Sequence, residues 1–346
     1  MNTGLGLVLP GVVAFLTALV GTRVVMLVAA RLAFKDQPGA EAHKQHARAV
    51  PYGGGVAIAV ALLVGVVTAY LVNHAVLTRE LLVIAGGGAV LLVIGLLDDR
   101  RPMGAWTKLA LQALVAAVVV PLADLGVDSL QQQWPWFAFL AAWGWMVVIT
   151  NAFNLIDHAD GISSTVAIIS AVVLALGAAM GTNGIDCLPW LVFIGAVGGF
   201  LCWNFPPAKI YMGDAGSLLI GYLIAAGTLH VTFWPASEGG NVLALAAPVI
   251  IVSIPLFDSA VVVLRRWSMG RPIMQGDRNH IGHRLGRLGL SPRTAVAVVA
   301  CLQTALAAGA LQLRHGEWTS GITVLAQCVA ILGAVVLLET RRDAGV

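Results

Sequence analysis

Long apolar runs without charged residues dominate this sequence and limit what the chain can fold into. Each run is about the 20 residues that a helix needs to cross a bilayer, and short polar segments separate one run from the next. The eleven runs begin near Leu5, Gly54, Glu80, Ala105, Trp134, Ile162, Cys187, Asp214, Asn241, Arg293 and Trp318. We therefore expect an all-α polytopic membrane protein with about eleven transmembrane helices.

Composition supports this fold class and excludes others. Of the 346 residues 59% are hydrophobic and only 11% are charged, whereas soluble domains carry roughly 25% charged residues. A net charge of +3 is too small to indicate a nucleic-acid partner. The four cysteines lie in or next to apolar runs without a C-x-x-C pair, so we expect buried thiols. No repeat or soluble domain is visible, and residues 1–346 are interpreted as one membrane domain.

The distribution of basic residues predicts the orientation in the membrane. Seventeen of the 20 Lys and Arg residues fall in alternate polar segments, seven of them in the long loop 265–293. Short loops rich in these residues remain in the cytoplasm. We expect the N-terminus outside, the C-terminus in the cytoplasm and the chain in the inner (plasma) membrane. The first run has no basic residue before Arg23, unlike a cleaved signal peptide, so it is interpreted as a helix of the mature protein.

Four polar segments, all on the side where the basic residues concentrate, carry the residues that could take part in catalysis or binding. They are Gly95–Arg101, Asn151–Gly161, Asn204–Ser217 and Gly276–Arg284. In the first segment, Asp98 and Asp99 end a run, where two carboxylates repel each other and oppose the negative end of the helix dipole. A divalent cation would relieve this repulsion, and so would pairing with Arg100 and Arg101; the motif alone leaves both open.

The second segment repeats a polar residue every three positions. Asn151, Asn154, Asp157 and Asp160 are neighbours on a helix that Gly161 is expected to end. An ionised side chain at membrane depth costs about 2.5 to 3.5 kcal/mol on insertion scales. Polar contacts between helices could explain the two amides but not the two acids, so the segment indicates function.

The other two segments are less specific when taken alone. Asp214 before Gly216 and Ser217 is an ordinary helix N-cap. The arginines of 265–293 could be surface charge that contacts anionic lipid. His280 and His283 could bind zinc, but no third soft ligand is near in sequence.

Together the four segments indicate one kind of chemistry. Carboxylates are hard ligands that select magnesium or manganese, while arginine and histidine suit phosphate groups. The combination predicts a metal-assisted reaction on a phosphorylated substrate at the cytoplasmic membrane surface. Phosphate-binding P-loop and dinucleotide motifs are absent from the sequence. The triplets Gly53–Gly55 and Gly86–Gly88 predict close helix packing instead.

The order of these motifs resembles one known family. Five segments are similar to the motifs of polyprenyl-phosphate N-acetylhexosamine-1-phosphate transferases, the glycosyl transferase family 4. They are Lys44-Gln-His46 before Val50-Pro-Tyr-Gly-Gly-Gly55, Asp98-Asp99 followed by Lys108, Asn151–Gly161, Asn204–Ser217 and Asp277–Leu285. The resemblance runs from Asp36 to Ala297. The last loop looks more like the N-acetylglucosamine branch than the muramoyl-pentapeptide branch.

Two positions depart from the family pattern. His158 replaces the first Gly of D-G-x-D-G, and Gly282 stands where a histidine is usual in H-x-H-H. The first departure bears on the local backbone and the metal side of the site. The second removes one possible phosphate donor.

The resemblance implies a reaction. Sugar 1-phosphate would pass from a UDP-N-acetylhexosamine, N-acetylglucosamine being favoured, to undecaprenyl or decaprenyl phosphate, with release of UMP. The step would begin cell-envelope polysaccharide synthesis and would need magnesium, or manganese in its place. The partners implied are the UDP-sugar, polyprenyl phosphate, membrane lipids and a second copy in a homodimer.

The expected roles combine the resemblance with the charge argument. The catalytic candidates are Asp98, Asp99, Asp157, Asp160, His280 and His283. The substrate-binding candidates are Lys44, His46, Lys108, Asn151, Asn154, Lys209 and Arg278, and the metal candidates are Asp214 and Asp99. Family accounts make the first Asp of the pair a general base. We expect positioning instead, because an acceptor phosphomonoester, with a second pKa of about 6, is mostly ionised at neutral pH.

Two rival functions are weighed against this one. An ion-coupled secondary transporter would place acids near span midpoints in two related halves, whereas these acids lie at span ends on one side. A catalytically silent family member is suggested only by His158 and Gly282.

The ninth run also contains two prolines, Pro248 and Pro255. They predict a kink near Ile254 to Asp258. Such a kink would open a lateral route for a prenyl tail; the alternative is that it only accommodates packing.

Overall fold

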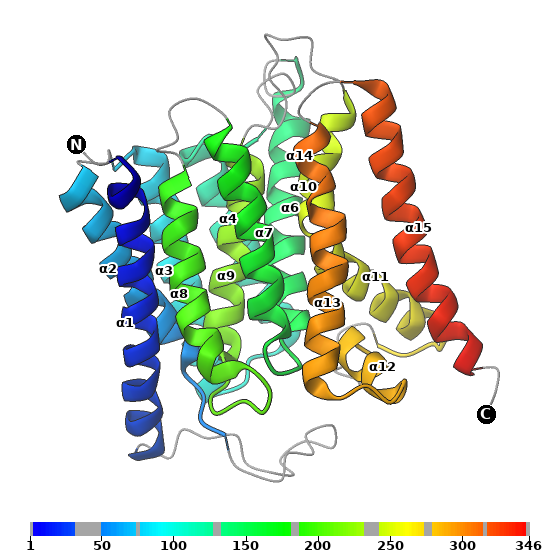
Figure 1. The fold of residues 1–346 in the computed structure, drawn as a ribbon, viewed down its shortest axis with the longest axis horizontal. Helices are drawn as coiled ribbons and strands as arrows, with labels where there is room; N and C mark the ends of the chain where they lie inside the picture. Colours follow the sequence, from blue (N-terminus) through cyan, green and yellow to red (C-terminus); the bar gives the residue numbers. More distant parts are fainter. Residues whose placement is uncertain are drawn as a thin grey trace.

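The chain is a bundle of helices in which nearly every predicted run is found (Figure 1). The structure, a computed structural model, describes residues 3–31, 50–73, 77–126, 133–180, 187–231, 242–272, 279–313 and 317–343. Within these ranges there is no β-strand. The predicted site residues Lys44, His46 and Arg278 lie outside the described residues.

The helices begin close to the positions that the apolar runs predict. They are α1 Thr3–Arg31, α2 Gly54–Asn73, α3 Arg79–Arg100, α4 Ala105–Leu122, α6 Pro135–Ile156, α7 Ile162–Ala179, α8 Leu188–Asn204, α9 Gly213–His230, α10 Ala247–Ile251 after the 3-10 turn η3 Val242–Ala246, α11 Ser253–Ser268, α12 Ile281–Arg287, α13 Pro292–Ala307, α14 Gly309–Gln312 and α15 Trp318–Asp343. A helix, or η3 in one case, begins within two residues of each predicted start.

The outer helices expose large apolar side chains, which is unfavourable in water. Among the described residues, eight helices are long and apolar enough to cross a membrane, and the bent pair α10–α11 would make a ninth. Leu63 on α2, Val93 on α3 and Leu114 on α4 are 65%, 54% and 63% exposed. Apolar faces of this extent indicate contact with lipid. The chain is therefore a polytopic, multi-pass membrane protein.

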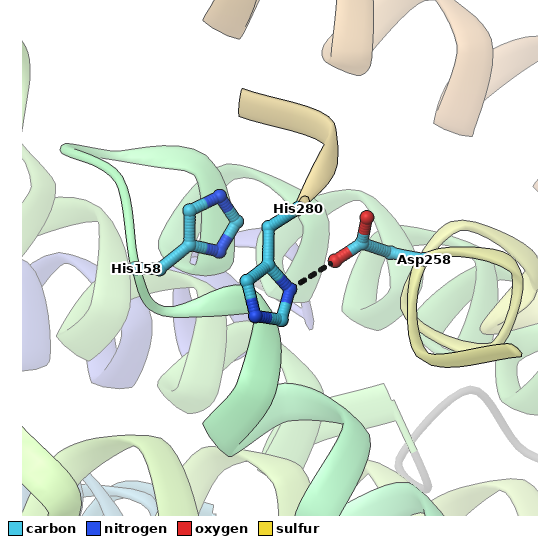
Figure 2. Close-up of side chains that lie close together, drawn as sticks. All are labelled: His158, Asp258 and His280. Atoms are coloured by element: carbon cyan, nitrogen blue, oxygen red, sulfur yellow. Dashed lines mark hydrogen bonds and ion pairs between the residues drawn. The ribbon is translucent and has the colours of Figure 1, made fainter. Parts of the chain in front are cut away.

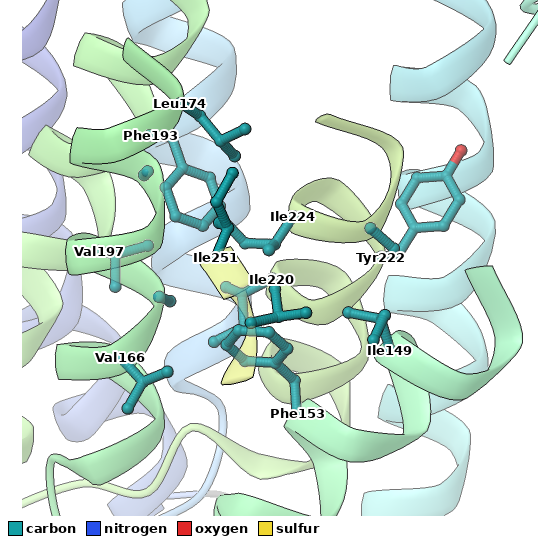
Figure 3. Packing of buried hydrophobic residues seen from close by; sticks show 14 of the residues in the cluster. Ile149, Phe153, Val166, Leu174, Phe193, Val197, Ile220, Tyr222, Ile224 and Ile251 are labelled. Carbon is teal, nitrogen blue, oxygen red and sulfur yellow. The ribbon is translucent and has the colours of Figure 1, made fainter. Parts of the chain in front are cut away.

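Helix α9 lies at the centre of the bundle and is buried along almost its whole length. It packs against α3, α6, α2 and α7, and Figure 3 shows Ile220 and Ile224 of α9 between Phe153 of α6 and Phe193 of α8. The neighbours come close because α9 carries small residues. A Cβ added to Gly221, for example, would lie 2.7 Å from the Cβ of Phe153.

Glycines set the approach of α2 and α3 to the first turn of α9. A side chain on Gly55 would collide with the backbone of Gly216, and one on Gly95 would collide with Ala215. The predicted packing role of the two glycine triplets is confirmed at Gly55 and at Gly87, which faces Tyr222. It is wrong at Gly86, where a Cβ would have no atom within 4 Å among the described residues.

The predicted kink in the ninth run exists and is sharp. Helices α10 and α11 meet at 77° around Val252, two residues before the stretch in which we expected it. Pro255 has no N–H to donate to the carbonyl of Ile251 four residues earlier. The regular ladder of hydrogen bonds therefore stops here.

Side chains from two other helices replace the missing backbone bonds. Gln303 of α13, which is 0% exposed, donates from Nε2 to the Ile251 carbonyl at 2.6 Å. Its Oε1 accepts a bond from the Ile254 N–H at 3.3 Å. Ser170 of α7 also donates to the Ile251 carbonyl at 2.9 Å. The break is thus satisfied by hydrogen bonds at membrane depth, where an unpaired backbone group is costly.

We expect Gln303→Leu to destabilise the protein, because it removes a donor to Ile251 and leaves the Ile254 N–H without its acceptor. A buried polar group that loses its partner costs about 1–3 kcal/mol. The measurement is the apparent melting temperature of the detergent-purified protein. Gln327→Leu on exposed α15 is the matched control, and equal melting temperatures for the two variants would contradict this account.

Candidate active site

The polar motifs lie at helix ends on one side of the bundle. They meet there because successive helices run in opposite directions. The end of α3, the start of α4, the end of α6 and the start of α9 lie on the side that also holds α12 and the C-terminal end of α15 (Figure 1). The start of α1 lies on the opposite side. Residues far apart in sequence thereby form one site.

Asp99 joins the end of α3 to the start of α9. Its Oδ1 accepts a hydrogen bond from the Asp214 N–H at 2.8 Å, and its Oδ2 accepts one from the Ala215 N–H at 3.2 Å. These amides belong to the first turn of α9, which has no intrahelical acceptors for them and attracts negative charge. Gly213, with φ +74°, has no Cβ that could collide with the Asp99 carboxylate.

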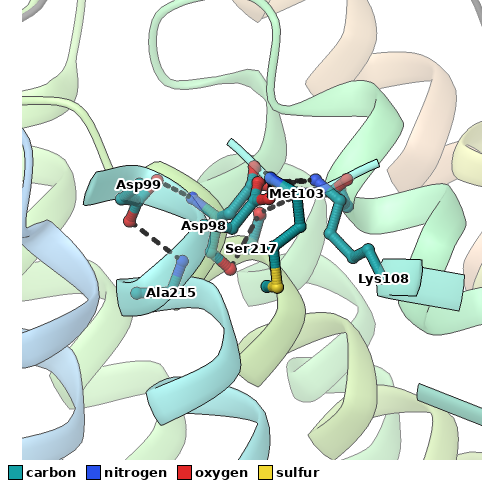
Figure 4. Close-up of polar contacts among 8 residues, drawn as sticks. Asp98, Asp99, Met103, Lys108, Ala215 and Ser217 are labelled. Atoms are coloured by element: carbon teal, nitrogen blue, oxygen red, sulfur yellow. Dashed lines mark hydrogen bonds and ion pairs between the residues drawn. The ribbon is translucent and has the colours of Figure 1, made fainter. Parts of the chain in front are cut away.

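Lys108 connects the two other acids of this region (Figure 4). Its Nζ donates to Asp98 Oδ2 at 2.9 Å and to Asp214 Oδ2. The second oxygen of Asp98 accepts a bond from the Met103 N–H at 2.6 Å. The side-chain amide of Asn154 donates to the second oxygen of Asp214 at 2.8 Å. Four of the predicted site residues therefore form one network.

Asp157 and Asp160 lie on the turn between α6 and α7. Burial raises the pKa of Asp157 well above its usual range, and the neighbouring carboxylates of Asp214, Asp99 and Asp160 raise it further. Asp160 has a structural contact, since its Oδ2 accepts a bond from the Ala208 N–H at 2.9 Å. The turn thus contributes acid to the network and is tied to the segment before α9.

The chemistry of the acidic cluster fits a divalent cation. Asp98, Asp99, Asp157 and Asp214 supply hard oxygen ligands of the kind that magnesium prefers. Each carboxylate oxygen has two lone pairs, so the bonds to Asp99 and Asp214 leave acceptor capacity. Burial is the main cause of the raised pKa of Asp157, and the carboxylates of Asp214, Asp99 and Asp160 raise it further; a cation would relieve this second effect.

A second cluster forms around Asp258, which the sequence argument did not select. Asp258 of α11 is 0% exposed. It contacts His280 Nδ1 at 2.8 Å (Figure 2). It also accepts bonds from the Ile281 N–H at 2.6 Å and from Arg284 at 3.2 Å. The bend at Val252 directs α11 toward the segment that begins at His280. An acid inside an apolar run was the available signal.

His158 brings a further imidazole to this cluster. Its ring stacks on His280 with centroids 4.3 Å apart and planes at 25°, and lies 5.0 Å from the ring of His283. Burial lowers the pKa of His158 well below its usual range, and His280 and His283 lower it further. His158 Nδ1 lies 3.2 Å from the Leu155 carbonyl, so in the neutral ring Nδ1 carries the proton.

Among the described residues His158, Asp258 and His280 form a group whose ligand atoms lie within 4.8 Å of one another. Two details oppose one shared metal ion. The 2.8 Å contact between Asp258 and His280 is shorter than the separation of about 3.3 Å between two ligands of a tetrahedral zinc. Stacked rings also direct their in-plane lone pairs along nearly parallel planes rather than at a common point. The cluster suits an anion better.

Two predicted site residues stay apart from these clusters in the structure. Lys209 is exposed, and its Nζ lies 5.2 Å from the centroid of the Trp203 ring. Asn151 is half-buried on α6, one turn before Asn154. Their assignment to substrate remains a prediction.

A helical membrane bundle with an acidic site at its helix ends fits a membrane-embedded transferase. Comparison with known proteins agrees with this class. The family model of Glycosyl transferase family 4 matches residues 81–232. A probable undecaprenyl-phosphate N-acetylglucosaminyl 1-phosphate transferase of Bacillus subtilis (strain 168) is 32% identical over 89% of this chain and 86% of its own length. The chain belongs to glycosyl transferase family 4.

More distant relatives carry related names. A decaprenyl-phosphate N-acetylglucosaminephosphotransferase of Mycobacterium tuberculosis (strain CDC 1551 / Oshkosh) is 29% identical over 97% of this chain and 89% of its own length. An undecaprenyl-phosphate alpha-N-acetylglucosaminyl 1-phosphate transferase of Yersinia pestis is 29% identical over 81% of this chain and 77% of its length. These names belong to the N-acetylglucosamine branch, as the resemblance of the last loop implies.

We expect Asp258→Asn to destabilise the protein and to displace His280. The substitution keeps the shape of the side chain but removes the charge that His280 and Arg284 contact, and breaking a buried ion pair costs about 3–5 kcal/mol. The apparent melting temperature in detergent measures the effect. Glu317→Gln, at an exposed position, is the control; a shift no larger than the control's would refute the role of Asp258.

Proposed function

We propose that this protein transfers N-acetylglucosamine 1-phosphate from a UDP-sugar to polyprenyl phosphate and releases UMP. The observation that carries the proposal is the network that joins Asp98, Asp99, Lys108 and Asp214 at the ends of three helices. Relatives whose names state this kind of transfer support it. The product would be the first lipid-linked intermediate of cell-envelope polysaccharide synthesis.

The residues present can handle the charges of such a reaction. Attack of a phosphate oxygen on the phosphorus of the nucleotide sugar brings anions together, and a bound magnesium ion neutralises part of that charge. Asp214, Asp99 and Asp157 would hold the ion. Lys108 offsets part of the negative charge of Asp98 and Asp214 and would offer its ammonium group to phosphate oxygens. His280 and His283 would contact the phosphates from the other side.

Asp98 suits positioning better than proton abstraction. Its Oδ1 accepts a bond from the Met103 N–H and its Oδ2 accepts one from Lys108, so the carboxylate is held between α4 and the loop before it. The acceptor phosphate needs no base, because its second pKa is about 6. Asp98 thus orients Lys108 and the loop that follows α3.

The location of the site supports a membrane arrangement. We infer eleven spans, an outside N-terminus and a cytoplasmic active site in the inner membrane, because basic residues concentrate on the side of the acids. The nucleotide sugar is then cytosolic while the prenyl chain stays in lipid. The 77° bend turns α11 across the bundle, and we assign its exposed Leu264 and Trp267 to contact with the lipid tail. A homodimer follows from the resemblance alone.

The rival functions have less support. A transporter would need acids near the middle of the spans, whereas Asp98, Asp99 and Asp214 lie at helix ends. A silent family member would lack an intact acidic network, yet here Asp98, Asp214 and Lys108 remain connected.

Activity is expected to require a divalent metal held by Asp214. EDTA should abolish UMP release from UDP-N-acetylglucosamine and polyprenyl phosphate, and magnesium or manganese should restore it. Asp214→Asn should be inactive at any magnesium concentration while it elutes as folded protein, because an amide is a weaker ligand than a carboxylate. Glu317→Gln, at an exposed position, is the control. Full turnover in EDTA would exclude the metal.

The pH dependence of an Asp98 variant separates positioning from base catalysis. Asp98→Asn should lower the rate by a similar factor at pH 7 and pH 9, since the acceptor phosphate is ionised at both. Initial rates of UMP release measure this. If high pH largely restored the rate, Asp98 would be the base.

A further inference from the structure

Gly282 leaves a space that His158 occupies. A Cβ built on Gly282 would lie 3.1 Å from His158 Nε2, and 2.9 Å from both Ala159 Cβ and Ile162 Cδ1. These distances are shorter than ordinary van der Waals contact. A side chain at 282 would therefore require His158, Ala159 and Ile162 to shift from their present positions.

The two positions are also those at which this chain departs from the family pattern. A histidine is present where the pattern has Gly, and Gly is present where the pattern has a histidine. The fold brings these positions into contact, although they are more than a hundred residues apart. The imidazole that the α12 segment lacks is thus present in the same space, supplied by the turn between α6 and α7.

His158 Nε2 is available for a ligand. It is buried and has no hydrogen-bond partner within the part of the chain that the structure describes, while Nδ1 faces the Leu155 carbonyl. A buried ring nitrogen without a partner is unfavourable. The positive charge of Arg284, which acts on His158, would attract an anion to this place.

We propose that His158 is a phosphate-binding residue that replaces the histidine missing at position 282, so that His158, His280 and His283 form a three-imidazole site for phosphoryl oxygens. The inference rests on the proposed function for the identity of the ligand, a nucleoside diphosphate. A neutral imidazole donates from one nitrogen, so the tautomer with its proton on Nε2 would donate to the phosphate in exchange for the contact between Nδ1 and Leu155. Asp258 holds His280 in place beside it.

Variants at positions 158 and 282 test whether His158 takes the role of a histidine at position 282. His158→Gly should lower kcat/KM for UDP-N-acetylglucosamine by about 10- to 100-fold, the loss that corresponds to one hydrogen bond to a charged group. Free imidazole added to His158→Gly should recover most of it. Gly282→His should lose activity, because its Cβ meets Ala159, Ile162 and His158. His230→Ala, at the other end of α9, is the control.

A binding measurement separates this inference from the proposed reaction. His158→Phe keeps an aromatic ring in the same space and removes both nitrogens, and it should weaken UDP binding to the detergent-purified protein by about 10- to 100-fold. If the wild type binds UDP but releases no UMP from the nucleotide sugar, the proposed reaction fails and this test still stands. Wild-type UDP affinity in His158→Phe, or a loss of activity in His158→Gly that imidazole does not restore, would overturn the role of His158.

Discussion

The pairing of Lys108 with two carboxylates from different helices is the interaction on which the site depends. A charge withdrawn from water must have a partner, and Lys108 at the start of α4 reaches Asp98 on α3 and Asp214 on α9. Asp99 then holds the first turn of α9 against the end of α3. Because α9 is the buried centre of the bundle, these bonds fix the helix ends at which the two substrates would meet.

The turn at residues 157–161 connects two chemically different clusters. The carboxylates of Asp214 and Asp99 act on Asp157, while the next residue, His158, stacks on His280. Gly161, with φ +72°, completes the turn, and its N–H donates to the Asn204 side chain. One short segment thus sets the distance between the groups suited to a metal and those suited to phosphate. A change in its backbone would affect both.

Local patterns predicted much of this molecule. Apolar runs gave helix starts within two residues, because burial in lipid depends on composition over about 20 residues. The motif acids were correctly expected to gather on one side. Asp258 and Gln303 were missed because their importance comes from partners far along the chain: Asp258 meets His280, and Gln303 meets Ile251. The contact of His158 with Gly282 was also invisible, since a sequence shows two departures but not that they share one space.

The break at Val252 has a consequence for how the protein is made. The Ile251 carbonyl and the Ile254 amide are satisfied by Gln303, which is synthesised about 50 residues later. Until α13 enters the membrane, the Ile254 amide lacks its acceptor and the Ile251 carbonyl has only the bond from Ser170 of α7. The bend that places Asp258 beside His280 therefore gains its full set of hydrogen bonds late in biogenesis, after the acidic network between α3, α4 and α9 has all its members.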